Sequence, residues 1–286
     1  KGNLTLGAND LTLGDATATA TFSGTTQQTI IGGAGGEDIL GTGIVQISNT
    51  SNEGVHFGAH AHLATNTLQL KLAADAVLTN TVMGHTLKDV TTLAGSSIVL
   101  DDNLAAADIV FTATETLTAA SIDPNSFIKM PANFDNGEAI VLFAEVKDAD
   151  VAAITADVNS ALVDTGLIDY VASTTSTDDI TVTAVETTDV QAATTLKVTV
   201  NDAKALRQAK TAFTGTAGGL DEFSDLLSLS NGHSLTDRSN FVSESAPQTE
   251  LIAGSTVAAQ GVTNSVQGIM SNRMASLRSG DAYVGT

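Results

Sequence analysis

The chain has 286 residues, no cysteine, 12 basic against 32 acidic side chains, and a formal net charge of −20. Without cysteine it forms no disulfide framework, thiolate nucleophile or thiolate-ligated metal site. The acidic balance argues against binding nucleic acid or anionic lipid through a basic field. Few charged residues (15%), few aromatic residues (4%) and 25 glycines are typical of a β-rich extracellular protein rather than a cytosolic enzyme.

The sequence shows neither a signal-peptide pattern nor an apolar run of 18 or more residues. We therefore expect no transmembrane helix. Because the chain opens at Lys1 directly in a β pattern, we expect a mature or excised piece with any export signal upstream.

Residues 1–124 are predicted to be a Thr/Gly-rich region of short strands separated by Gly, Asn and Asp turns. A Leu-Thr-Leu-Gly unit occurs at residues 4–7 and again at residues 11–14. In residues 68–72 three leucines fall on one face of a strand. An antiparallel sandwich and a parallel β-solenoid both fit. We favour a right-handed parallel solenoid (β-helix), because stacked coils need only small inward apolar residues with Gly or Asn at the corners.

Residues 125–200 are predicted to form a mixed α/β cap. Residues 139–146 are a strong buried-strand run, and Asp148 can cap a helix that ends near Gly166. The cap would shield the last coil, since an open solenoid end exposes unpaired strand edges. Further strands are expected at residues 167–172, 180–185 and 196–200, the last two as neighbours.

Two helical regions are predicted to follow. Over residues 201–245 we expect short helices, one capped by Asn201 or Asp202 and another at residues 220–227. Residues 246–286 contain the longest periodic segment, and its small, uncharged polar side chains suit a helix inside a narrow water-filled tube.

Residues 261–280 resemble the junction between passenger and translocator barrel in bacterial autotransporters, the type V secretion family. Residues 271–278, Ser-Asn-Arg-Met-Ala-Ser-Leu-Arg, are a variant of that family's xxRLxxLR pattern. Residues 243–249 are similar to the LSPE element before the junction helix. The resemblance covers roughly residues 195–280, and the Thr/Asn/Ala-rich β stretch before it looks most like the rickettsial surface-antigen branch. The junction residues are Asn272, Arg273, Met274, Leu277 and Arg278.

The resemblance implies a passenger exported through a Gram-negative outer membrane by its own C-terminal barrel, the translocator partner, which would begin after Thr286. The passenger would lie on the extracellular face, with a structural or adhesive role in a surface layer, self-assembly or host attachment. One subgroup cleaves itself at an Asn-Asn pair, but Gly268 and Ile269 stand there, so this route is not expected. An ordinary C-terminal amphipathic helix in an unrelated β protein is the alternative.

Metal sites have only weak sequence candidates. On a strand His60 and His62 would share one face and could meet a metal, but no further ligand is obviously placed. The glycine-rich residues 32–40 resemble one nonapeptide of a calcium-binding β-roll, which needs tandem copies. Ca²⁺ on a surface protein remains a hypothesis. Its carboxylate candidates are Asp101, Asp102, Asp178 and Asp179.

We expect no enzymatic activity. The sequence lacks the Gly-x-Ser-x-Gly elbow of serine hydrolases, and its acidic pairs lie in polar contexts that would not raise a catalytic pKa. A β-solenoid enzyme acting on polysaccharides is the main rival, although 12 basic residues, no Trp and two Tyr equip the chain poorly for sugars. A filament or phage structural subunit is a second rival, which the junction pattern disfavours.

Overall fold

The computed structural model describes 17 strands and three helices, so the chain is mostly β. It divides into two compact units, Lys1–Asp164 with Ile168–Glu186, and Thr165–Leu167 with Thr187–Thr286. These units differ from the four regions expected from the sequence, with boundaries at residues 124, 200 and 245. The described residues are 2–33, 37–101, 104–113, 117–118, 120–131, 134–146, 150–174 and 178–213, with Val266, Met270 and Ser271.

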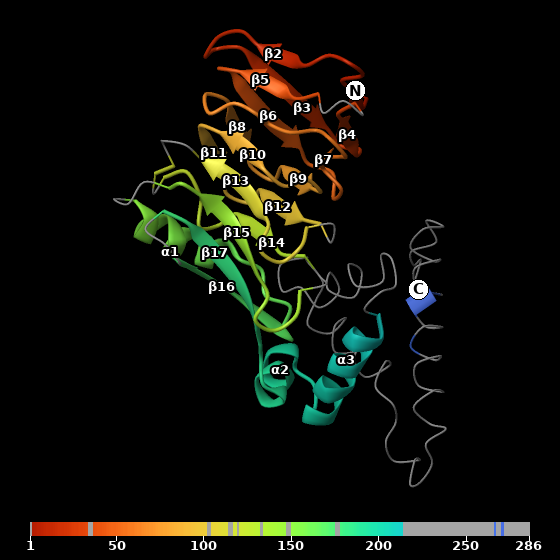
Figure 1. Ribbon diagram of the computed structural model, residues 1–286. Helices are drawn as coiled ribbons and strands as arrows, with labels where there is room; N and C mark the ends of the chain where they lie inside the picture. Colours follow the sequence, from red (N-terminus) through yellow and green to blue (C-terminus); the bar gives the residue numbers. More distant parts are fainter. Residues whose placement is uncertain are drawn as a thin grey trace. The chain divides into compact units, whose positions relative to one another are not determined.

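Parallel pairing builds most of the first unit (Figure 1). The six-stranded sheet contains, in spatial order, β1 (Leu4–Thr5), β4 (Gln28–Ile31), β7 (Val55–Phe57), β9 (Val77–Asn80), β12 (Ser97–Leu100) and β14 (Phe127–Lys129). The four-stranded sheet contains β11 (Asp89–Thr92), β8 (Gln69–Leu72), β6 (Ile44–Asn49) and β3 (Thr19–Gly24). The two-stranded sheet pairs β2 (Leu11–Leu13) with β5 (Ile39–Gly41).

The fourth sheet, with five strands, mixes both pairing directions. In this sheet β10 pairs with β13 and β13 with β15 in parallel, whereas β15 pairs with β17 and β17 with β16 antiparallel. Its members are β10 (His85–Leu87), β13 (Ile109–Ala113), β15 (Ala139–Ala144), β17 (Ile180–Glu186) and β16 (Ile168–Thr174).

The chain returns to each sheet at intervals that keep the strands in register. In the four-stranded sheet Thr19 pairs with Ile44, and Ile44 with Gln69, each 25 residues further along. Among the described strands, antiparallel neighbours occur only around β15, β17 and β16, which is not the pattern of the antiparallel sandwich considered above. Parallel pairing reaches β14 and β15, beyond the boundary expected at residue 124.

Side-chain alternation explains why these segments form strands with one buried face. Leu68, Leu70 and Leu72 are at most 1% exposed, as their spacing predicts, while Gln69 and Lys71 on β8 are partly exposed. At one corner Gly54 has a φ of +60°, and a Cβ there would meet the Val77 carbonyl oxygen at 2.0 Å. Glycine is therefore required where these neighbouring segments approach each other.

Helix α1 (Val151–Ala161) follows β15 and confirms the predicted helix. Ile154, Val158 and Ala161 are its buried residues, at the spacing read from the sequence. The helix ends at Ala161, earlier than the expected end near Gly166, and its N-cap is Asp150. The predicted cap Asp148 lies outside the described residues.

The second unit contains α2 (Asp189–Leu196) and α3 (Val200–Phe213). The strand expected at residues 196–200, paired with residues 180–185, is therefore wrong. Thr188 forms a capping box with Gln191 that starts α2, and Lys197 ends it with a left-handed φ of 59°. The apolar alternation marked the end of one helix and the start of the next.

Helix α3 begins one or two residues before the expected cap. The Thr199 hydroxyl accepts from the Asp202 backbone N–H at 3.2 Å, and the Asp202 carboxylate accepts from the Thr199 N–H at 3.0 Å. Thr199 therefore caps the helix, with Asp202 as its reciprocal partner.

Most of the expected C-terminal helices lie outside the described residues, including residues 220–227. From the long predicted helix only Val266, Met270 and Ser271 are described, and they are helical. No helix within the described ranges is long and apolar enough to cross a membrane.

Candidate functional site

In the first unit, polar contacts gather at the outer edges of the last strands of its three larger sheets, β16, β14 and β11. An outermost strand leaves a row of backbone N–H and C=O groups without partners. In the five-stranded sheet that strand is β16. The Asn159 side chain of α1 meets it: its Oδ1 accepts from the Ala172 N–H at 2.8 Å, and its Nδ2 donates to the Ala172 carbonyl at 2.9 Å. One amide side chain thus takes the place of a neighbouring strand.

A second side chain continues this protection along β16. Asp164 Oδ1 accepts from the Tyr170 N–H at 2.8 Å, two residues before Ala172. Burial raises the pKa of Asp164; the Tyr170 hydrogen bond opposes this shift, and the charge of Asp169 adds to it. Burial also raises the pKa of Asp169. The backbone N–H groups of Tyr170 and Ala172, which point away from β17, are therefore hydrogen-bonded by Asp164 and Asn159.

The last strands of the other two large sheets are also met by following segments. Beyond β14, Leu162 forms a parallel bridge with Ile128, and the Val163 N–H donates to the Ile128 carbonyl at 3.0 Å. Beyond β11, the Thr92 N–H donates to the Ser121 carbonyl at 2.9 Å. We call this set of contacts around Ser121, Asn159, Leu162, Val163 and Asp164 the end seal.

The acidic pair at residues 178–179 directly precedes β17 and contacts the residues that follow β15. The Glu145 N–H donates to Asp179 Oδ1 at 3.2 Å, and the Val146 N–H donates to the Asp178 carbonyl at 2.6 Å. Glu145 itself has a left-handed φ of 60°. These contacts give the pair a structural role where the end of β15 meets the start of β17.

The other acidic candidate is only half described. The Asp101 N–H donates to the Asn80 carbonyl at 3.1 Å, and the Asp101 carbonyl accepts from Leu104 at 3.0 Å, so Asp101 lies in a turn. Asp102 lies outside the described residues. In the part of the chain that the structure describes, no group of three or more His, Cys, Asp or Glu side chains is arranged to hold a metal ion.

The predicted histidine pair does not have strand geometry. His60 is exposed in a turn with a left-handed φ of 63°, so it does not share a strand face with His62. His62 Nδ1 instead lies 3.4 Å from Asp38 Oδ1, and both side chains are partly exposed (34% and 27%).

A third histidine, His85, is completely buried in the inward column of the five-stranded sheet. It is in register with Phe111, and Phe111 with Phe143, and each consecutive pair of rings stacks with centroids 5.6 Å apart. Its Nδ1 accepts from the Leu63 N–H at 3.1 Å, so the proton of the neutral ring lies on Nε2, which donates to Asn80 Oδ1 at 2.8 Å.

Burial lowers the pKa of His85 to about 3, and the neighbouring His62 adds to the shift. The ring is therefore neutral in the folded protein at physiological pH. Sequence reasoning passed over His85, because one histidine in a polar stretch carries no spacing signal; its 26-residue offset from Phe111 emerges only from the strand register.

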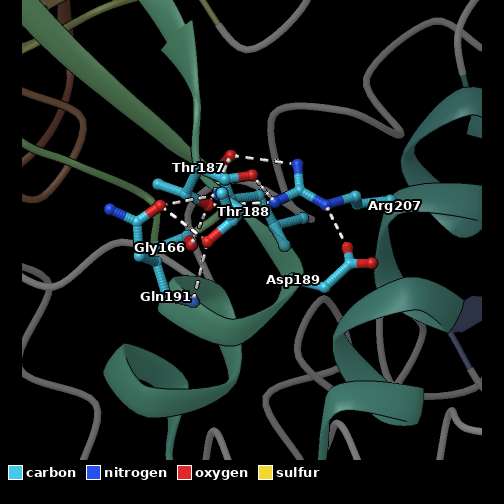
Figure 2. A network of polar contacts seen from close by, with 7 residues as sticks. Gly166, Thr187, Thr188, Asp189, Gln191 and Arg207 are labelled. Atoms are coloured by element: carbon cyan, nitrogen blue, oxygen red, sulfur yellow. Dashed lines mark hydrogen bonds and ion pairs between the residues drawn. The ribbon is translucent and has the colours of Figure 1, made fainter.

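Arg207 of α3 organises a separate polar network in the second unit (Figure 2). Its Nε lies 2.9 Å from Asp189 Oδ1, at the first residue of α2. One terminal nitrogen donates to the Leu167 carbonyl at 3.3 Å, and the other donates to the carbonyl and hydroxyl oxygens of Thr187. The planar guanidinium thus joins α3 to the start of α2 and to the Leu167 segment.

The same network fixes the backbone around Gly166. The Thr187 hydroxyl donates at 3.0 Å to the carbonyls of Gly166 and Leu167. Gly166 has a φ of +82°, and a Cβ there would lie 2.8 Å from Leu196 Cδ2. Among the described residues, the contacts of Arg207 and Thr187 are thus structural ones that bind helix ends and backbone.

The predicted junction residues Asn272, Arg273, Met274, Leu277 and Arg278 lie outside the described residues. Comparisons of the chain with protein-family models, with curated proteins and with solved structures each gave no match.

Proposed function

We propose that this chain is the passenger of a bacterial autotransporter, a non-enzymatic scaffold or adhesin on the outer face of a Gram-negative outer membrane. In this proposal the parallel sheets are the sides of a right-handed β-solenoid, which gives a stiff extracellular rod without disulfides. The observation that carries the proposal is the in-register parallel pairing, repeated as the chain returns to the same sheets.

The end seal supports a role as a self-contained rod. A stack of parallel strands needs a terminal cap to remain soluble. Asn159 and Asp164 hold the backbone of β16, and the antiparallel pair β16 and β17 ends the parallel order of its sheet.

The junction pattern of Arg273 and Leu277 supplies the link to export, and the composition is compatible with it. A passenger crosses a narrow barrel as an extended chain, and a chain without cysteine forms no disulfide that would block threading. The translocator barrel is then the first partner, and neighbouring passengers or host surfaces are later partners.

Surface display tests the export proposal. The chain is fused to the barrel of an established autotransporter in a Gram-negative host, and protease is added to intact cells. We expect the chain to be exposed and cleaved, and we expect an Arg273→Ala/Leu277→Ala double variant to reach the surface less. A Lys204→Ala variant on α3 is the control. Equal display of all three fusions would contradict the junction role.

The rival reading as a polysaccharide-acting enzyme makes a distinct prediction. A solenoid hydrolase or lyase would release products from acidic or neutral polysaccharides, and turnover by the purified chain would overturn the scaffold proposal. Calcium bridging between the acidic surfaces of neighbouring chains belongs to the same proposal. EDTA should then lower the Tm or disperse assemblies, and an unchanged Tm and assembly state would eliminate calcium.

A further inference from the structure

The outer edge of β3 (Thr19–Gly24) meets no neighbouring strand and no side-chain seal from the described residues. On its inner side β3 pairs with β6: the Ile44 N–H donates to the Ala18 carbonyl at 2.8 Å, and the Thr50 N–H to the Gly24 carbonyl at 3.1 Å. Alternate residues of a paired strand direct their backbone groups to opposite edges. Because Ala18 and Gly24 face β6, the groups of Thr19, Thr21 and Ser23 face outward, where no described residue forms a strand pair.

This edge also exposes apolar side chains, whereas the equivalent side chains of the next strand, β6, are buried. Ala20 and Phe22 of β3 remain partly exposed, whereas the residues in register on β6, Val45 and Ile47, are 0% exposed. Proteins blunt such edges with proline, charge, bulges or a covering segment. The sequence of β3, Thr-Ala-Thr-Phe-Ser-Gly, contains no charge and no proline, and its register with β6 is continuous.

We propose that this edge binds a second copy of the chain, with two β3 strands pairing antiparallel about a two-fold axis. Outward N–H and C=O groups at strand spacing are satisfied by another strand. Head-to-tail stacking is disfavoured because the end seal occupies the last edges, so the self-complementary pairing remains.

Charge favours the same arrangement. The chain carries a net charge of −20, which repels copies that meet through most of their surfaces. β3 has no ionisable side chain, so pairing it with itself places no like charges directly opposite each other. With six residues it is also longer than the other first strands, β1 with two and β2 with three.

The absence of cysteine from the chain allows a direct test with single-cysteine variants. In an antiparallel pair facing Cα atoms lie about 4.5–5.5 Å apart, which a disulfide spans. Only the residue on the two-fold axis faces its own copy, so we expect at least one of five single variants to give a covalent dimer on oxidation: Thr19→Cys, Ala20→Cys, Thr21→Cys, Phe22→Cys and Ser23→Cys. Gln46→Cys is the matched control, because Gln46 is in register with Thr21 but one strand further in. It should remain monomeric on a non-reducing gel.

A second variant tests the pairing without cross-linking. Thr21→Pro removes an outward N–H that β6 does not use, so the fold should keep its Tm. Sedimentation over a concentration series should give twice the 29.0 kDa chain mass for the unmodified chain and the single-chain mass for Thr21→Pro. A monomer at every concentration, or a dimer that neither Thr21→Pro nor the cysteine scan detects, would overturn the proposal. These readouts use purified chain and do not depend on export.

Discussion

The parallel sheets end differently at their first and last strands. After the last strands the end seal meets the backbone of β11, β14 and β16. At the first strands β3 presents a six-residue edge without such contacts from any described residue. Strand β3 (Thr-Ala-Thr-Phe-Ser-Gly) and strand β16 (Ile-Asp-Tyr-Val-Ala-Ser-Thr) both contain several strand-favouring residues, so propensity does not explain why only β16 is sealed. The difference teaches that termination comes from a few side chains placed beside a strand, outside the strand itself.

The largest expected effect comes from removing the sealed end entirely. Deleting residues 147–286 exposes the edges of β14 and β15, which belong to two different sheets. We expect the remaining chain to aggregate because both edges lose their cover. Light scattering after size exclusion measures this. The comparison deletion, residues 2–26, exchanges the open edge of β3 for that of β6 and leaves the end seal in place, so it should increase aggregation less. A monodisperse product from the first deletion would refute the role of the seal.

Between the two edges, the buried His85 should make the folded protein less stable in acid. Its pKa is about 3 in the fold against 6.5 unfolded, so the unfolded chain binds more protons between these values. The stability is fully present above pH 6.5 and falls by about 1.4 kcal/mol per pH unit below it, down to about pH 3.

Urea unfolding at several pH values measures the slope. His85→Phe should be less stable at pH 7, since the Leu63 N–H loses its acceptor and Asn80 Oδ1 loses the His85 donor, but its slope should be flatter. The control, His56→Gln, changes a partly exposed ring and should keep the slope. An unchanged slope in His85→Phe would show that another group causes the acid sensitivity. Asp164 and Asp169 act oppositely, because their raised pKa values favour the fold as the pH falls.

Local alternation identified individual elements well. The leucines of residues 68–72 and the apolar positions of α1 are predictable because each depends only on the spacing of near neighbours. Small inward apolar residues, with Gly or Asn at the corners, also favoured parallel pairing. Partner choice was not predictable in the same way: residues 196–200 alternate like a strand, yet the capping box at Thr188 and the left-handed Lys197 make them the boundary between two helices.

The structural polar residues were hidden for a related reason. Asn159 is a helix-surface amide and Arg207 a helix-surface cation in the sequence, and nothing local indicates that one meets Ala172 and the other Leu167. Both contacts depend on tertiary placement. The more conspicuous histidine and aspartate pairs attracted attention through spacing, but His60 and Asp101 lie in turns.

The Arg207 network of the second unit should have a smaller effect on the free energy of unfolding. Arg207→Ala removes the ion pair with Asp189 and the donors to Leu167 and Thr187, so we expect a loss of about 2–3 kcal/mol in the free energy of unfolding. Chemical denaturation followed by circular dichroism measures it. Lys204→Ala, an exposed change on the same helix, is the control. Equal stability of both variants would mean that Arg207 is a bystander.

The smallest expected change sharpens the comparison of the two edges most directly. Asn159→Ala removes both contacts with Ala172, so we expect a loss of about 1 kcal/mol together with a new tendency to associate. Sedimentation and urea titration measure the two effects. Ser160→Ala is the neighbouring control, because Ser160 bonds only within the helix, to the Ala156 carbonyl. If both variants associate to the same extent, Asn159 does not protect the edge of β16.

The 25-residue offset between Thr19, Ile44 and Gln69 has a consequence for the length of the protein. Because the segment from Ile44 to Leu68 begins and ends at equivalent positions, a second copy of it inserted after Leu68 would offer each existing strand an equivalent neighbour. The parallel sheets would gain strands, while Asn159 and Asp164 would still contact β16. In the solenoid that we propose, whole coils could be gained or lost by duplication or deletion, so the number of coils would be free to vary while the end seal stays unchanged.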